Sequence, residues 1–302
     1  MSGFKFNPDA PLYTSDARAW RMDEFSLVMD QLLAPGKPVV IFVHGRGKEP
    51  GKSLQGGTFT KGLAVHKIER GYDAKVLMFN WDSAFHGFNF LDREVPLSHT
   101  ASGGVALGEL LVQIAQYQAT HPRSKKPALL AHSMGSIVVQ HAIQDGHWPA
   151  TKQLFSAVLF SEPDADDKGH ASWLDQVAQR EQTFVTLNKD DNVLHRSTDA
   201  RAAGTHALGL GTNEPLAPKA KYIDIANMGP LGKKDEDHEV FGKGAMNGQI
   251  YLCQFFTQAL TGETVVLDSA INVESVTSGV IYRLRDRSEP GASCLKVPDL
   301  PH

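Results

Sequence analysis

The chain has 302 residues, of which 41% are hydrophobic and 21% charged, a composition typical of a globular protein with a buried core. Its formal net charge of -4 lacks the basic excess of proteins that bind nucleic acids. No apolar run reaches the roughly 18 residues of a membrane span, and two cysteines are too few for a disulfide framework. The N-terminal residues also lack the apolar stretch of a signal peptide, so we expect a cytoplasmic protein without a nucleic-acid partner.

Short apolar runs in the first third of the chain predict strands, separated by helical or polar segments. Residues 17–24 are predicted as an edge strand and residues 25–33 as a short helix. Residues 39–45, VVIFVHG, are apolar on both faces, which is typical of a buried parallel strand. Residues 75–81, KVLMFNW, predict the next strand, and the phenylalanine-rich residues 82–100 predict a long loop at a pocket mouth.

The rest of the chain continues the alternation of strands and helices. Helices are predicted at residues 107–117, from residue 136 onward, and at residues 172–179 and 244–260, and strands at residues 128–131, 156–160, 183–187 and 221–225. Residues 195–220 are rich in Gly, Ala and Pro and predict an irregular excursion. This order indicates an α/β protein with a mostly parallel central sheet and helices on both faces.

The C-terminal residues follow a core that is complete by residue 262. We therefore predict one domain over residues 1–262 and a C-terminal extension over residues 263–302. Residues 264–267 and 276–284 of the extension resemble strands. The extension is too short to fold alone, so we expect it to pack on the domain or on a second subunit of a homo-oligomer.

The segment ALLAHSMGSIVV, residues 128–139, reads as a strand, a very tight turn and a helix with Ser133 at the tip. A nucleophile elbow has this layout, because small neighbours allow the backbone to bend sharply at a strained serine. Gly135 is the small residue after Ser133, and Ala131 stands where glycine is usual. A serine in such a turn is also a common helix N-cap, so the motif needs support from the rest of the chain.

That support comes from chain order. Residues 39–45, the elbow at residues 131–135, an acidic turn and a late histidine together resemble the α/β-hydrolase superfamily, which has the order Ser, Asp or Glu, His. The resemblance covers roughly residues 25–260 and is greatest to esterase-like serine hydrolases. It implies an α/β-hydrolase fold in which Ser133 is the nucleophile. It also implies an oxyanion hole formed by the backbone N–H groups of Met134 and Arg46.

The same resemblance implies the other two members of a catalytic triad. The base is expected between the last core strand and the last helix, where His238 is the one histidine, with Phe241 shortly after it. The acid is expected after the strand at residues 183–187. Asp191 fits best because an apolar pair follows it, and Asp190 and Asp164 remain alternatives. Any of the three carboxylates could instead serve as a turn or cap residue.

The sequence gives no support for nucleotide binding or for a metal site. Residues 47–53, GKEPGKS, resemble a phosphate-binding loop, but the first glycine is one residue too close and Pro50 removes a backbone donor. No H-E-x-x-H motif or cysteine pair indicates a metal site. We therefore expect no cofactor and no metal.

The sequence thus predicts a serine hydrolase that cleaves a small-molecule carboxylic ester through an acyl-enzyme on Ser133. Two other functions remain open. One is a thioesterase or amidase with the same triad, and the other is a noncatalytic binding protein that keeps the fold. Chain order favours the ester hydrolase without identifying its acyl or alcohol group.

Overall fold

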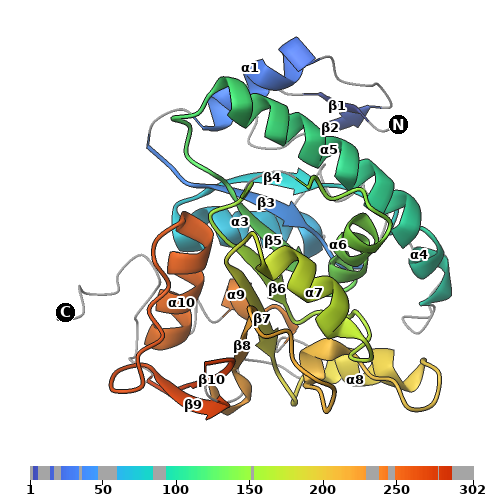
Figure 1. Cartoon of the computed structure of the whole chain (residues 1–302), viewed down its shortest axis with the longest axis vertical. Helices are drawn as coiled ribbons and strands as arrows, with labels where there is room; N and C mark the ends of the chain where they lie inside the picture. The colour runs from blue at the N-terminus through green and yellow to red at the C-terminus, as the bar shows by residue number, and fades with distance from the viewer. Residues whose placement is uncertain are drawn as a thin grey trace.

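The computed structural model describes residues 3–5, 14–16, 22–33, 36–46, 60–83, 93–150, 153–228, 238–243, 249–277 and 279–287. The phosphate-loop-like residues 47–53 and the phenylalanines at positions 85, 88 and 90 lie outside these ranges. In the described part, strands and helices alternate from β3 to α10, and the strands gather in the middle of the molecule (Figure 1).

Eight strands form one sheet in the spatial order β4-β3-β5-β6-β7-β8-β10-β9. They are β3 (Val39–Val43), β4 (Lys75–Phe79), β5 (Ala128–His132), β6 (Val158–Ser161), β7 (Thr183–Leu187), β8 (Lys221–Asp224), β9 (Val273–Thr277) and β10 (Ile281–Leu284). Every neighbouring pair is parallel except β10 and β9. The short strands β1 (Gly3–Lys5) and β2 (Thr14–Asp16) form a separate antiparallel pair. The predicted mostly parallel sheet is confirmed.

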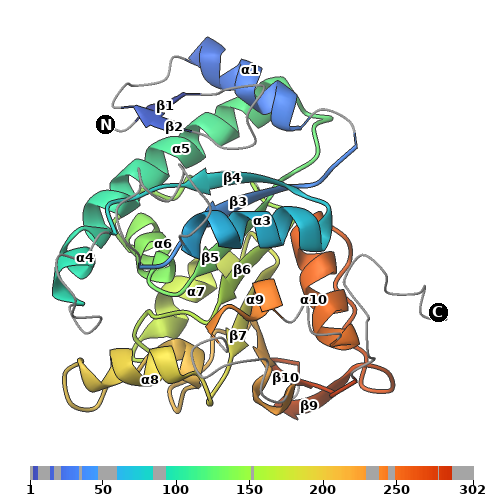
Figure 2. The same cartoon turned by 180° about the vertical axis from the view of Figure 1, so that it is seen from behind.

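Helices cover both faces of this sheet (Figures 1 and 2). One face packs against α1 (Met22–Leu32), α5 (Thr100–Thr120), α6 (Gly135–Gln144) and α7 (His170–Ala178). The other face packs against α3 (Thr60–Tyr72), α9 (Val240–Lys243) and α10 (Ile250–Thr261). Side chains of β3 alternate between the two cores, because successive residues of a strand point to opposite faces. Ile41 and Val43 enter the first core and Val40 and Phe42 the second.

Three segments form helices where the sequence predicted a strand, a loop and an irregular segment. Residues 17–21 of the predicted edge strand and residues 244–248 of the predicted last helix lie outside the described residues. Residues 22–24, expected at the end of an edge strand, begin α1. Residues 94–100, expected in a loop, form α4 (Glu94–Ser98) and start α5. Residues 195–199, expected to be irregular, lie in α8 (Asn192–Asp199). In the last case a cap explains the difference, because the Asp191 side chain accepts hydrogen bonds from the first turn of the helix.

The C-terminal strands extend the main sheet. Residues 264–267 are not a strand, but β9 and β10 form an antiparallel pair, and β10 adds to the edge of β8 in parallel register. Arg283 Nε also donates a hydrogen bond to Asp224 Oδ2 of β8 across 2.9 Å. Part of the predicted extension therefore packs on the domain through backbone pairing.

Candidate active site

Ser133 lies in the turn between β5 and α6, at the carboxyl edge of the sheet. Its φ of +52° is in the left-handed region, which is uncommon for a residue with a side chain and stores backbone strain. The backbone around it is fixed by hydrogen bonds. Ser133 N donates to Ser161 O at 3.1 Å, and Ser133 O accepts from Ser136 Oγ at 2.7 Å and from Asp164 N at 3.1 Å. A strained serine held this firmly presents its hydroxyl in a fixed position.

Two glycines allow the turn to approach β3. A Cβ atom on Gly135 would lie 2.4 Å from Val43 O, so no larger residue fits between the elbow and that strand. A Cβ atom on Gly45 would lie 2.8 Å from Ser133 Cβ and 3.3 Å from Ser133 Oγ. The end of β3 therefore contacts the turn at Ser133 through bare backbone, which leaves room around the serine hydroxyl.

The structure brings Ser133, His238 and Asp191 together from three separate parts of the chain. His238 Nε2 lies 2.8 Å from Ser133 Oγ, and His238 Nδ1 lies 2.7 Å from Asp191 Oδ2. Because an ionised carboxylate only accepts, Nδ1 carries a proton in this pair and Nε2 is free to accept from the hydroxyl. The arrangement has the geometry of a Ser-His-Asp triad.

Asp191 holds His238 with one oxygen and a helix with the other. Oδ1 accepts from Val193 N at 2.8 Å and from Leu194 N at 3.0 Å, which caps α8. Oδ2 is left for the histidine. The cap locks the side-chain rotamer of a fully buried carboxylate, so Asp191 points at His238 in one orientation. The cap and the contact with the imidazole, weighed as alternatives from sequence, occur together.

The segment that carries His238 is held by two polar side chains that the sequence did not single out for this task. His132 Nε2 donates to the backbone oxygen of His238 at 2.6 Å, and the two rings lie 4.7 Å apart. Glu162, in the left-handed region at φ +47°, accepts from Val240 N at 3.3 Å. Glu162 follows β6 directly, so its position at a strand end was the available signal.

Charge around His238 is dominated by carboxylates. Burial by itself lowers the pKa of His238, but the negative charges of Asp191, Glu162 and Asp164 outweigh it and raise the pKa to about 9. Burial, and then the charge of Asp191, raises the pKa of Glu162 well above its usual range. Burial, and then the His238 cation, lowers the pKa of His132 to about 4.

The remaining residues proposed from sequence lie as follows. Asp190 is exposed, one residue away from the carboxylate that contacts His238. Met134 is buried before α6, and its N–H finds no acceptor within the described part of the chain. Arg46 follows Gly45 at the end of β3. His44 stacks on Trp81 and its Nε2 lies 3.0 Å from Asn80 Oδ1, so it braces the end of β4.

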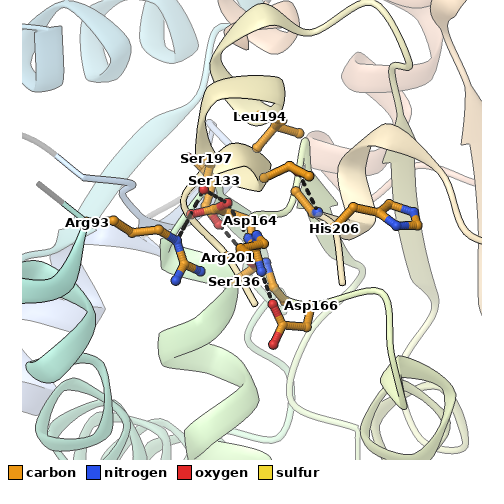
Figure 3. Close-up of polar contacts among 12 residues, drawn as sticks. Arg93, Ser133, Ser136, Asp164, Asp166, Leu194, Ser197, Arg201 and His206 are labelled. Atoms are coloured by element: carbon orange, nitrogen blue, oxygen red, sulfur yellow. Dashed lines mark hydrogen bonds and ion pairs between the residues drawn. The ribbon is translucent and has the colours of Figure 1, made fainter. Parts of the chain in front are cut away.

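Asp164, the third candidate acid, belongs to a different group of residues (Figure 3). Its Oδ1 accepts from Ser197 Oγ and from Arg201 Nη2, both at 2.6 Å. Arg93 Nε lies 3.6 Å from its Oδ2. Asp164 therefore faces two arginines, whereas the histidine is held by Asp191.

Neither a metal site nor a membrane span is found in the part of the chain that the structure describes. Within it, no three or more His, Cys, Asp or Glu side chains converge on one point as metal ligands would. None of its helices has both the length and the apolar surface needed to cross a bilayer.

The comparisons with known proteins agree with this geometry. A family model described as "Alpha/beta hydrolase of unknown function (DUF900)" matches residues 23–221, a range that contains Ser133 and Asp191 and ends before His238. No curated protein and no solved structure matches the chain. The eight-stranded sheet and this family match lead to the same result: the chain belongs to the DUF900 family of α/β hydrolases.

Proposed function

We propose that this protein is a serine hydrolase that cleaves carboxylic esters. The observation that carries the proposal is the chain of two hydrogen bonds from Asp191 through His238 to Ser133, with the serine strained at a nucleophile elbow. A serine hydroxyl is a poor nucleophile at neutral pH unless a base accepts its proton and an acid fixes the base. This site has side chains for each of these tasks.

Acylation begins when Ser133 Oγ attacks the ester carbonyl carbon and its proton moves to His238 Nε2. The carbonyl oxygen becomes an oxyanion, for which the backbone N–H groups of Met134 and Arg46 are the proposed donors. His238 then gives the proton to the leaving alkoxide. The alcohol departs and the acyl group remains bonded to Ser133 Oγ.

Deacylation repeats the same steps with water. His238 Nε2 takes a proton from the water molecule, whose oxygen attacks the acyl carbon. When the second tetrahedral intermediate collapses, His238 returns the proton to Ser133 Oγ and the carboxylic acid is released. Asp191 remains ionised throughout and stabilises the imidazolium in both halves of the reaction.

An active-site-directed fluorophosphonate tests this proposal. We expect the wild-type protein to be labelled and Ser133→Ala to remain unlabelled. Ser172→Ala, which removes an exposed hydroxyl far along the chain, should be labelled like wild type. No labelling of wild type by a range of such probes would contradict the proposal and favour a noncatalytic binding protein with this fold.

A second experiment identifies the type of bond that the protein cleaves. An ester, a thioester and an anilide with the same acyl group should be compared by kcat/KM. The proposal predicts the highest value for the ester. A higher value for the thioester or the anilide would keep the triad and change the substrate to that class.

A further inference from the structure

Arg93 contacts residues at the carboxyl edge of the sheet and is linked to the elbow through Asp164. It follows β4, yet its Nε donates to Ser197 Oγ of α8 at 3.2 Å and lies 3.6 Å from Asp164 Oδ2, after β6. In the sheet, β3 and β5 separate β4 from β6 and β7. Arg93 therefore contacts residues that follow β6 and β7, whereas Ser133 follows β5, the neighbour of β6 in the sheet. Asp164 N also donates to Ser133 O, so Arg93 and the elbow share a neighbour (Figure 3).

The second arginine of this group, Arg201, has its own carboxylate partners. Its Nη2 donates to Asp164 Oδ1 at 2.6 Å and to Asp164 O at 2.5 Å, and its Nη1 donates to Asp166 Oδ1. The side chain is only 2% exposed. Burial lowers the pKa of Arg201, and the nearby charge of Arg93 lowers it further. The two guanidinium groups are thus close enough to repel each other.

The positive charge of Arg93 is only partly balanced by the carboxylates of the described residues. Its side chain is 8% exposed, and the one carboxylate paired with it among the described residues, Asp164, is engaged more closely by Arg201. Asp166 is 52% exposed, so water screens much of its charge. Within the described residues, Nε is the one nitrogen of Arg93 with a protein acceptor.

The terminal nitrogens of Arg93 are nonetheless not sealed from solvent. Arg201 Nε is fully buried and has no hydrogen-bond partner among the described residues. No nitrogen of Arg93 is both fully buried and unpaired within that part of the chain, so the terminal nitrogens of Arg93 remain accessible to solvent. A guanidinium group whose stem is fixed, and whose planar terminal donors remain accessible, is suited to bind a carboxylate through two parallel hydrogen bonds. A largely buried cation with acceptors for only one of its three nitrogens is otherwise costly to keep.

We propose that Arg93 binds an anionic group of the substrate, so that the preferred ester carries a carboxylate near the scissile bond. This proposal rests on the proposed function and names its substrate class. Ser197 and Asp164 fix Nε and so orient the terminal nitrogens. The bound carboxylate supplies the acceptors that the described residues do not.

Two matched pairs of esters test the proposal. The first pair is the mono-para-nitrophenyl ester of adipic acid and its methyl-capped diester, which differ by one charge on the acyl side. The second pair is the butyrate ester of meta-hydroxybenzoate and that of its methyl ester, which differ on the alcohol side. For each pair, the ratio of kcat/KM for the charged ester to kcat/KM for the neutral ester is measured. We expect wild type to prefer the charged ester of one pair, and that pair shows on which side of the bond the anion lies.

Arg93→Met should lower this ratio about 10- to 100-fold, as expected for a lost hydrogen bond to a charged group. Arg93→Lys keeps the charge without the planar donors and should lower the ratio less. The matched control is Arg123→Met, an exposed arginine before β5 at the opposite edge of the sheet, which should keep the wild-type ratio.

Two results would overturn the proposal. One is a wild type without preference for either charged ester, and the other is a ratio that Arg93→Met and Arg93→Lys leave unchanged. A merely structural role of Arg93 would slow both esters of a pair equally and keep the ratio. Failure of the proposed function is distinguishable, because wild type would then turn over neither the charged nor the neutral esters.

Discussion

His132 Nε2 donates a hydrogen bond to the backbone oxygen of His238 across 2.6 Å, so the residue next to the nucleophile in sequence holds the histidine that contacts it. His132 also packs edge-on against Phe241 at 5.1 Å. Because Ser133 directly follows His132 at the end of β5, this bond couples the position of the imidazole to that of the hydroxyl. The nucleophile elbow thus positions its own proposed base.

The first prediction concerns this bond. His132→Phe keeps an aromatic ring against Phe241 but removes the donor, and we expect kcat/KM for a simple ester to fall about tenfold, the usual effect of one lost hydrogen bond. Circular dichroism should show an unchanged fold. His141→Gln, at an exposed histidine of α6 with an acidic neighbour, is the control. Equal rates in the two variants would show that the bond does not position His238.

The second prediction concerns pH. The base must be neutral to accept a proton, and carboxylates raise the pKa of His238 to about 9. We therefore expect kcat/KM to rise about tenfold per pH unit below that value and to level off above it. The measurement is kcat/KM for a neutral ester across this range. A profile that is already flat from neutral pH upward would contradict the expected charge state of His238.

A third prediction assigns part of that shift to Glu162. The charge of Glu162 favours the protonated form of His238, so Glu162→Gln should move the inflection of the pH profile to lower pH. The amide oxygen can still accept from Val240 N, which keeps the anchor of the histidine segment. An unchanged inflection, with the variant folded, would show that Glu162 acts only as an anchor.

The fourth prediction separates the candidate acids. Replacing the acid that orients a triad histidine typically lowers turnover by about 10⁴. Asp191→Asn should show a loss of this size, because it changes the group 2.7 Å from His238 Nδ1. Asp190→Asn is the matched control one residue away on the surface and should keep the wild-type rate. A roughly 10⁴-fold loss of turnover in Asp190→Asn, with Asp191→Asn near the wild-type rate, would show that Asp190 is the acid.

The fifth prediction gives Asp164 a structural task. Asp164→Asn leaves Arg201 buried with a weaker partner, and breaking a buried ion pair in this way typically costs about 3 kcal/mol. The free energy of unfolding, measured in urea, should fall by an amount of this order, without the 10⁴-fold loss of turnover expected for Asp191→Asn. A free energy of unfolding equal to that of wild type would show that the charge of Asp164 does not stabilise the fold.

Chain order predicted the sheet, and the resemblance to α/β hydrolases predicted Ser133, His238 and, as the best of three candidate acids, Asp191. Ser133, Asp191 and His238 each follow or precede a strongly patterned element, and the carboxyl ends of parallel strands meet at one edge. The helix α8 was missed because its sequence, NVLHRSTD, has few apolar residues. Its start depends on the cap by Asp191, and that cap coexists with the contact to His238.

The buried charges could not be predicted, because their environment is set by residues far away in sequence. Arg93 forms a hydrogen bond with Ser197, which is 104 residues later in the chain. Glu162 forms one with Val240, which is 78 residues later. Arg93 stands in a segment predicted as a long loop and Glu162 follows a strand, so neither position indicates which residue it contacts. The strained φ of Glu162 also has no signature in composition, since left-handed turns favour glycine or asparagine.

The most direct test of the account is to trap the acyl-enzyme. Wild-type protein mixed with para-nitrophenyl butyrate and quenched in acid should gain the mass of one butyryl group, located on Ser133 by peptide mass spectrometry. Ser133→Ala should gain no such mass. Turnover of the ester by wild type with the acyl group on another residue, or equal turnover by Ser133→Ala, would contradict the proposed mechanism.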